Sequence, residues 1–242
     1  AFAPNYLTVD DTAGGQLRVH YLDEGPRGAD PVLVMHGEPT WSYLYRHMIP
    51  GFTGAGHRVI APDLVGFGRS DKPTQRTDYT YQRHVDWMAD MLRQLDLRNI
   101  TLVCQDWGGI LGLTLPMAMP HRFNRLLVMN TGIPIGEPLS EGFAMWKGFA
   151  AMAPEVPTGG LIALDAGEAM NLFDVMAYDA PFPDEIFMTG IRTLPSMGSM
   201  IDTQRSLKDW DALKQFTKPF LRVFGQFDML VGSKKTQNTL IE

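Results

Sequence analysis

The sequence predicts an α/β fold in which a mostly parallel sheet is flanked by helices and carries an inserted helical cap. Three observations lead to this fold class. Continuous apolar strands end in charged or glycine-rich turns, and helical patterns separate these strands along the chain. Between about residues 132 and 213 the alternation stops, and Gly/Pro turns divide short segments rich in Met and Phe. The alternation resumes at Phe220, so the middle segment is expected to cover the strand ends.

The composition is that of an ordinary globular protein. With 242 residues, of which 45% are hydrophobic and 20% charged, the chain can bury a large core, and we expect one enlarged domain. A net charge of −6 and scattered Lys and Arg residues argue against a nucleic-acid partner. The single cysteine, Cys104, excludes a disulfide within the chain, and no apolar run is long enough to cross a membrane. We expect a monomer in the cytoplasm.

Two different patterns predict the first strands. Residues 17–22 alternate between polar and apolar side chains, which places them at or near a sheet edge with His20 at the surface. Residues 31–35 form a continuous apolar run, which is typical of a central parallel strand. This strand ends in a His36-Gly37 turn, at the end of the sheet where ligands bind in open α/β folds.

A second buried strand is expected at residues 58–62. The charged, glycine-rich loop that follows at 63–73 lacks the spacing of a phosphate-binding loop, so we interpret its charges as a structural network. A helix is expected to begin within residues 41–49. Apolar residues at helical spacing predict another helix over 81–95, on which His84 faces solvent.

The most informative stretch is the apolar strand at residues 100–105, which runs directly into Asp106 and then Trp and two glycines. The glycines let the following helix approach the strand closely, and residues 110–119 supply a nearly all-apolar helix. This pattern predicts a nucleophile elbow, a sharp turn that exposes a reactive side chain. Further strands are expected at 125–130 and 220–228.

Asp106 occupies the nucleophile position of this elbow, where hydrolases often have serine. A carboxylate is ionised at neutral pH, so it can displace a leaving group from saturated carbon without first losing a proton to a base. The alternative is an Asp that caps the following helix. From these residues alone, both interpretations stay open.

Three motifs extend the comparison to a known family. They are His36-Gly37-Glu38-Pro39-Thr40-Trp41-Ser42-Tyr43-Leu44-Tyr45-Arg46, Gly66-Phe67-Gly68-Arg69-Ser70-Asp71-Lys72-Pro73 and Gln105-Asp106-Trp107-Gly108-Gly109. Together they resemble the haloalkane dehalogenases, which have the α/β-hydrolase fold, and the resemblance spans nearly the whole chain. It implies hydrolysis of small haloalkanes to an alcohol and a halide through a covalent alkyl ester, with no cofactor and no metal.

Carried over position by position, the resemblance makes Asp106 the nucleophile that forms the ester. The backbone N–H groups of Glu38 and Trp107 would form the oxyanion hole. The indole N–H groups of Trp107 and Trp146 would bind the halide, because the cap segment around Trp146 resembles the subfamily with a His-Gly-Glu-Pro turn and a second halide-binding tryptophan. Without the resemblance, a tryptophan in a cap rich in Met and Phe more often only packs in the hydrophobic core. The expected substrate pocket also includes Phe143, Ile110 and Pro195.

The acid that orients the catalytic histidine follows one of two strands in this family. Asn130 occupies the earlier place, so Asp228 is expected to take the role. The hydrolase order requires a histidine after this acid, but none of the six histidines follows Asp228. We therefore expect the chain to end before its last strand, catalytic histidine and closing helix. The main domain is expected at residues 1–132 and 214–242, with the helical cap at 133–213.

Three other functions share parts of this sequence pattern. Epoxide hydrolases share the Asp nucleophile but use a pair of cap tyrosines, whereas the expected cap holds only Tyr178. Fluoroacetate dehalogenases usually place Arg after the nucleophile, where this chain has Trp107. A noncatalytic or single-turnover binding protein would keep the pocket and lack the base.

Overall fold

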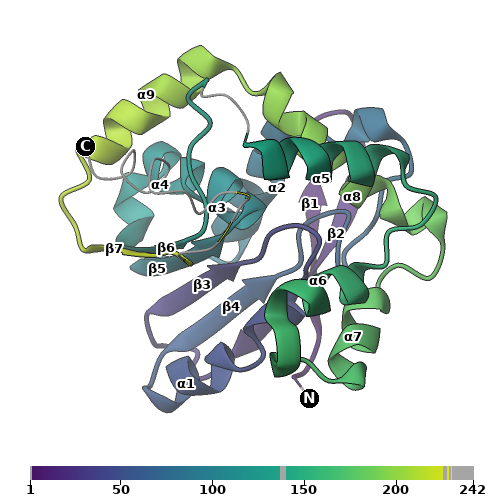
Figure 1. The fold of residues 1–242 in the computed structure, drawn as a ribbon. Helices are drawn as coiled ribbons and strands as arrows, with labels where there is room; N and C mark the ends of the chain where they lie inside the picture. Colours follow the sequence, from purple (N-terminus) through teal and green to yellow (C-terminus); the bar gives the residue numbers. More distant parts are fainter. Residues whose placement is uncertain (1, 137–139, 226–227, 229, 231–242) are drawn as a thin grey trace.

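The computed structural model of the protein describes residues 2–136, 140–225, 228 and 230, and seven strands lie in this part of the chain. They are β1 (Asn5–Asp10), β2 (Gln16–Glu24), β3 (Pro31–Met35), β4 (Arg58–Pro62), β5 (Ile100–Gln105), β6 (Phe123–Met129) and β7 (Phe220–Val223). In this part of the chain they form one seven-stranded sheet with the order β1-β2-β4-β3-β5-β6-β7 (Figure 1). The pairs β1–β2 and β2–β4 are antiparallel and the others are parallel, which confirms the predicted mostly parallel sheet.

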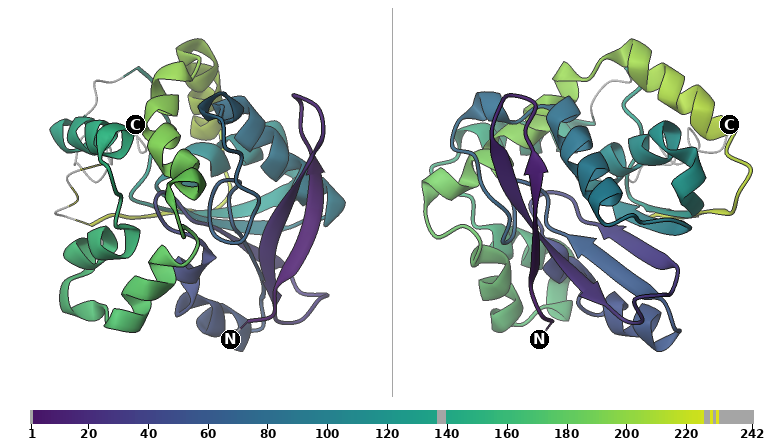
Figure 2. Two further views of the ribbon diagram at one scale, coloured as in Figure 1. Left: turned by 90° about the vertical axis from the view of Figure 1, so that its right-hand side faces the viewer. Right: turned by 180° about the vertical axis from the view of Figure 1, so that it is seen from behind.

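β1 and β2 form a twisted antiparallel pair at one edge of the sheet (Figure 2). The prediction that residues 17–22 lie at or near an edge is confirmed, because only β1 lies outside β2. β1 itself was not predicted. Of its six residues only Val9 is buried, so its sequence carries little of the hydrophobic alternation that marks a strand.

Helices connect the strands and cover the sheet. They are α1 (Met48–Gly54), α2 (Tyr81–Gln94), α3 (Trp107–Gly112), α4 (Thr114–Ala118), α5 (Glu141–Met152), α6 (Thr158–Ala166), α7 (Leu172–Asp179), α8 (Thr189–Met197) and α9 (Thr203–Lys214). The helix expected over residues 110–119 is divided between α3 and α4. Pro116 explains the division, because it has no N–H to donate to the carbonyl of Gly112 four residues earlier.

Alternate residues of the central strand β3 face two separate cores. Leu33 and Met35 pack in the core that includes buried residues of α2, α3, α4 and α9. Val32 and Val34 pack on the opposite side, where Ile49 of α1 lies in the same cluster. All residues of β3 are buried, which confirms the prediction of a central strand covered on both faces.

α5 to α8 gather on one side of the molecule, at the end toward which β3 and β4 point (Figures 1 and 2). Within this group α5 packs against α8 and α6 against α7. α9 packs instead against α4, and its residues Trp210 and Leu213 belong to the core that contains Leu33 and Met35. The division of the chain into a main domain and a cap over residues 133–213 stays a prediction.

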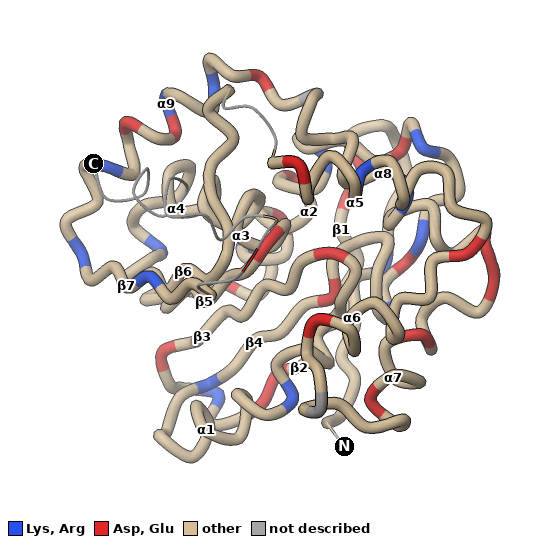
Figure 3. The backbone as a smooth tube through the Cα atoms, viewed as in Figure 1, with Lys and Arg blue, Asp and Glu red and all other residues tan. Residues whose placement is uncertain are grey.

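Charged residues of both signs are spread over the outer helices and loops (Figure 3). This distribution agrees with the scattered Lys and Arg residues of the sequence. Among the described residues, no helix is both long enough and apolar enough to span a lipid bilayer.

Two histidines correct the expectations drawn from the sequence. His20 is fully buried instead of lying at the surface, with its Nδ1 2.7 Å from Asp63 Oδ2, because the loop after β4 covers this face of β2. His84 is also buried, and this burial lowers its pKa to about 4. Asp63 further accepts hydrogen bonds from the backbone N–H groups of Ser42 and Arg69, which confirms the structural network predicted for the loop.

Candidate active site

Asp106 lies at the turn between β5 and α3, with a φ of 52° that residues other than glycine rarely adopt. Two hydrogen bonds hold this turn. The Asp106 N–H donates to the Asn130 carbonyl at 3.1 Å, and the Thr131 hydroxyl donates to the Asp106 carbonyl at 2.7 Å. Gly108 permits close packing, since a Cβ there would lie 2.2 Å from the carbonyl oxygen of Met35. The turn therefore has the strained, tightly packed geometry of a nucleophile elbow.

The Asp106 carboxylate faces the turn that follows β3. The Glu38 N–H donates to its Oδ1 at 2.7 Å, and a Cβ on Gly37 would lie 2.2 Å from the same oxygen, so only glycine fits at that position. Burial raises the pKa of Asp106 to about 6, although hydrogen bonds from the backbone N–H groups of Trp107 and Glu38 lower it. The charge of Asp228 adds to the rise. Above about pH 6 this buried group is therefore an anion.

The side chain of Glu38 enters the same site. Burial, and then the charge of Asp106, raise the pKa of Glu38 well above its usual range, while the indole N–H groups of Trp146 and Trp107 oppose this rise. Both indoles face the carboxylate, but neither completes a hydrogen bond. The two buried carboxylate oxygens of Glu38 consequently have no hydrogen-bond partner among the described residues. Four residues named from the sequence thus lie together, two of them carboxylates and two of them tryptophans.

Trp146 reaches this site from α5, and α8 fixes the end of that helix. The buried guanidinium of Arg192 on α8 donates to the carbonyls of Ala150 at 3.3 Å, Ala153 at 2.7 Å and Pro154 at 3.2 Å. These carbonyls belong to the last turn of α5 and the residues just after it, which have no partner within the helix. Arg192 therefore holds the helix that carries Trp146.

A second group of contacts joins α7 to residues 43–46, which follow the His36-Gly37 turn. Asp174 on α7 accepts a hydrogen bond from the Tyr43 hydroxyl at 2.8 Å and pairs with Arg46 at 2.9 Å. Arg46 also donates to the hydroxyl of Tyr178 at 3.3 Å. The hydroxyl of this tyrosine is therefore engaged with Arg46.

Asp228 and Asn130 occupy the two alternative positions for the acid that orients a catalytic histidine. Asn130 Nδ2 donates to Asp228 Oδ2, and the Gly225 N–H donates to Asn130 Oδ1 at 3.1 Å. The charge of Asp228 acts on Asp106, since it raises the pKa of that carboxyl. The two positions therefore lie side by side next to the site.

His36 lies beside the site but has both ring nitrogens engaged. The Leu64 N–H donates to Nε2 at 2.9 Å, so the ring proton is on Nδ1, which donates to the Gly37 carbonyl at 2.8 Å. Burial lowers the pKa of His36, which keeps the ring neutral. This histidine is placed to support the turn and has no free nitrogen to accept a proton from water.

The three residues expected to line a pocket lie on different helices. Phe143 is on α5, nearly one turn before Trp146, and Ile110 is in α3 close to the elbow. Pro195 is buried within α8, which packs against α5. Their part in a substrate pocket stays a prediction.

Sequence reasoning missed two features of this site. The Thr131 hydroxyl that holds the elbow follows a strand end, and nothing in the local pattern distinguishes it from other threonines. The buried side chain of Glu38 was also missed, because only its backbone was assigned a role. A charged residue directly after a His-Gly turn, at the sheet end where ligands bind, was the available signal.

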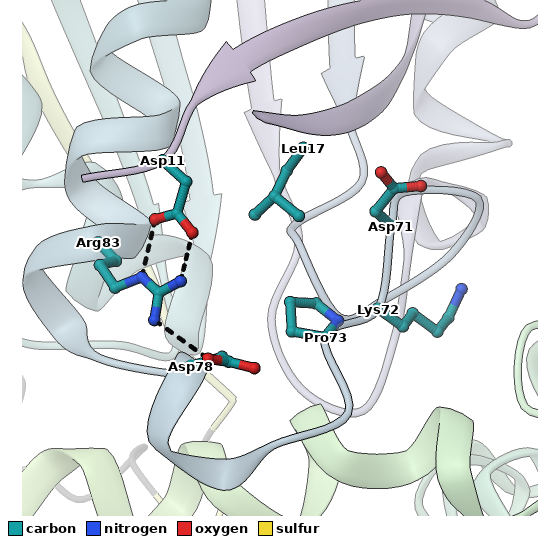
Figure 4. A pocket seen from close by; sticks show the side chains of 7 residues that line it. All are labelled: Asp11, Leu17, Asp71, Lys72, Pro73, Asp78 and Arg83. Atoms are coloured by element: carbon teal, nitrogen blue, oxygen red, sulfur yellow. Dashed lines mark hydrogen bonds and ion pairs between the residues drawn. The ribbon is translucent and has the colours of Figure 1, made fainter. Parts of the chain in front are cut away.

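A separate hollow of about 340 Å³ is lined by Asp11, Leu17, Asp71, Lys72, Pro73, Asp78 and Arg83 (Figure 4). Within it, the guanidinium of Arg83 pairs with both Asp11 and Asp78. The protein itself therefore neutralises this cation. None of the residues predicted to act on a substrate lines the hollow.

The sheet order and the Asp106 turn are those of an α/β hydrolase, and residues 30–155 match the family model described as alpha/beta hydrolase fold. The sequence is 53% identical to a haloalkane dehalogenase of Psychrobacter cryohalolentis, over 94% of this chain and 77% of that protein. It is 42% identical to a haloalkane dehalogenase of Mycolicibacterium paratuberculosis, over 96% of this chain and 78% of that protein. The chain belongs to the haloalkane dehalogenases, hydrolases that act on carbon–halide bonds.

A solved structure supports the same assignment. The tetrameric haloalkane dehalogenase DpaA of Paraglaciecola agarilytica superposes with a TM-score of 0.91 at 43% identity. The match covers 98% of this chain and 81% of that chain. The α/β-hydrolase fold predicted from the sequence is therefore confirmed.

Proposed function

We propose that this protein removes the halogen from small, uncharged haloalkanes through an alkyl ester on Asp106. The observation that carries the proposal is the setting of the Asp106 carboxylate. It accepts the Glu38 N–H at 2.7 Å and shares a buried site with the indoles of Trp107 and Trp146. A nucleophile, an N–H donor for a developing oxyanion and two donors for a halide thus belong to one site.

In the first step, a carboxylate oxygen of Asp106 attacks the carbon that bears the halogen. A C–O bond forms, and the electron pair of the breaking carbon–halogen bond leaves with the halide. No base is needed, because Asp106 is ionised above about pH 6. A halide in an apolar site loses its hydration and needs donors to replace it. We assign this role to the indole N–H groups of Trp107 and Trp146.

In the second step, water attacks the carbonyl of the ester. The backbone N–H groups of Glu38 and Trp107 would stabilise the negative charge on the carbonyl oxygen. This step needs a base that activates water, and Asp228 would orient that base. None of the six histidines follows Asp228, and His36 has both ring nitrogens engaged. We therefore expect the chain of 242 residues to stop at the ester.

The substrates we expect are uncharged molecules with a chloride, bromide or iodide leaving group. Phe143, Ile110 and Pro195 would offer apolar surface to the alkyl part. The residue after the nucleophile is Trp107, so this position offers no cation for a carboxylate. Faster reaction with haloacids than with neutral haloalkanes would contradict this assignment.

Epoxide hydrolysis is the alternative with the same nucleophile. It requires an acid that protonates the epoxide oxygen, and Tyr178 is the tyrosine in the expected cap. Its hydroxyl accepts a hydrogen bond from Arg46, outside the group formed by Asp106, Glu38 and the two indoles. Labelling by an epoxide in preference to a haloalkane would favour this alternative.

Mass spectrometry of the intact chain tests the proposal. After incubation with n-butyl bromide at about pH 8, we expect one added butyl group per chain, mapped to Asp106 by peptide digestion, and one bromide released. The matched control is Asp106→Asn, which keeps the size of the side chain and removes its charge. It should show neither the label nor the bromide.

Two outcomes would contradict parts of the proposal. A label on another residue, or equal labelling of the Asp106→Asn variant, would exclude Asp106 as the nucleophile. Continuous release of many bromides per chain would show that another group activates water. In that case His36 would be the first residue to replace.

A further inference from the structure

We propose that the Glu38 carboxylate is a proton-linked competitor for the halide site, so that a halide binds only as Glu38 takes up a proton. This inference rests on the proposed function, because it takes the indole N–H groups of Trp107 and Trp146 as the halide donors. It assigns a role to the side chain of Glu38, whose backbone N–H already faces the nucleophile.

The geometry places one anion where another would have to bind. The backbone of Glu38 is fixed by its 2.7 Å hydrogen bond to Asp106 Oδ1, and its carboxylate is directed toward the two indole N–H groups. A halide bound by the same two donors would contact this carboxylate. Two anions in a buried site repel strongly, so the Glu38 carboxylate has to lose its charge when the halide arrives.

The surroundings of Glu38 favour its neutral form. Its two oxygens are buried, and among the described residues neither accepts a hydrogen bond, which makes the ionised form costly. Asp106 faces it from the turn between β5 and α3, Trp107 from α3 and Trp146 from α5. Asp228 acts on Asp106 in turn. Burial and the Asp106 charge raise the pKa of Glu38, and the indoles oppose the rise.

The proton balance of the reaction fits this role. Hydrolysis of a haloalkane by water yields an alcohol, one halide and one proton. A halide beside protonated Glu38 carries one negative charge, the same as ionised Glu38 without a halide, so the net charge of the buried site does not change when a proton and a halide arrive together. At a pH above the pKa of Glu38, release of the halide then returns the carboxylate to its ionised form and the proton to solvent.

Halide affinity measured against pH tests the inference. Asp106→Asn is the suitable background, because it prevents ester formation and removes the second carboxylate that titrates in the site. Bromide binding would be followed by quenching of tryptophan fluorescence from about pH 5 to about pH 9. Above the pKa of Glu38, we expect the bromide Kd to rise about tenfold per pH unit. Adding Glu38→Gln should make the Kd nearly independent of pH.

A second measurement does not depend on the Gln variant folding well. Bromide would be added to the Asp106→Asn variant in weakly buffered solution at a pH above the pKa of Glu38. The protein should then take up about one proton per bromide bound, which a pH indicator measures. Binding without proton uptake, or the same pH dependence after Glu38→Gln, would overturn the inference. Absence of saturable quenching at every pH would instead contradict the halide site of the proposed function. The two failures are therefore distinguishable.

Discussion

Asp106 combines two properties that oppose each other, since it has to be an anion and is buried. The carboxylate accepts the Glu38 N–H, yet burial still raises its pKa to about 6. Because only the ionised form attacks carbon, the rate of ester formation should fall about tenfold per pH unit below about pH 6 and level off above it. Rapid mixing with n-butyl bromide, followed by bromide release in a single turnover, measures this profile.

Asp228 provides the control for this profile. Its charge raises the pKa of Asp106, so Asp228→Asn should move the midpoint of the pH profile to lower pH. The level reached at high pH should change little, because ester formation needs no histidine. A midpoint that stays in place would show that Asp106 does not respond to Asp228.

Halide binding should depend on a tryptophan that lies far from the nucleophile in the sequence. Trp146→Phe keeps most of the side-chain volume and removes the N–H, so the halide Kd should rise at least about tenfold, the value of a hydrogen bond to a charged group. The matched control is Trp210→Phe, since Trp210 belongs to α9 and the main core. An equal halide Kd, measured by fluorescence quenching, in wild type and Trp146→Phe would exclude Trp146 as a halide donor.

At the scale of the elements, α5 can present Trp146 only while its C-terminus is held. Arg192→Met keeps an apolar stem and removes the donors to the carbonyls of Ala150, Ala153 and Pro154. We expect a loss of about 2 kcal/mol in the free energy of unfolding, measured with urea, together with weaker halide binding.

Glu185→Gln is the control for this change. Glu185 is 76% exposed at the side chain and pairs with Arg192 at 3.4 Å, so its loss should cost no more than about 0.5 kcal/mol. An Arg192→Met variant as stable as wild type would show that the carbonyls at the end of α5 find other donors.

The sequence predicted the central elements because their signals are local. β3 and β5 are continuous apolar runs, and their flanking glycines mark turns, so both strands and the Asp106 turn were expected correctly. β1 escaped because one buried residue gives no pattern. His20 and His84 were misplaced because distant residues contact them, Ser70 in the case of His20 and the backbone of Val65 in the case of His84. Alternation along one strand or helix cannot report such contacts.

The site was predictable from the sequence only in part. The position of Asp106 followed from its own neighbours, whereas Trp146 was named only through a resemblance to known proteins. The approach of Trp146 to Glu38 depends on how α5 packs against α8, and no local pattern contains that information. The same holds for the contact between Asn130 and Asp228, which joins residues 98 positions apart.

At the scale of the whole molecule, the buried nucleophile should cost stability. The pKa of Asp106 is about 6 in the folded protein and about 3.9 in an unfolded chain, so folding opposes ionisation. This cost is absent below about pH 4, grows as pH rises and is complete above about pH 6. Asp106→Asn should therefore be more stable than wild type at about pH 8, by roughly 2 to 3 kcal/mol.

Urea unfolding at about pH 8 and at about pH 4 measures this difference, which should vanish at the lower pH. Asp211→Asn serves as the control. Asp211 is exposed and pairs with Lys214, so its replacement should change stability by less than about 1 kcal/mol. An Asp106→Asn variant that is less stable than wild type at the higher pH would mean that the hydrogen bond from Glu38 outweighs the cost of burial.

The φ of 52° at Asp106 also limits which chemistries this position can acquire in evolution. Side chains branched at Cβ are disfavoured at positive φ, whereas Ser, Cys, Asp and Asn meet a smaller penalty. A descendant of this enzyme could exchange its carboxylate for a hydroxyl or a thiol by replacing one residue on an unchanged backbone. Threonine, although its hydroxyl is chemically competent, would first require the turn between β5 and α3 to relax. The backbone therefore selects among nucleophiles before their reactivity is tested.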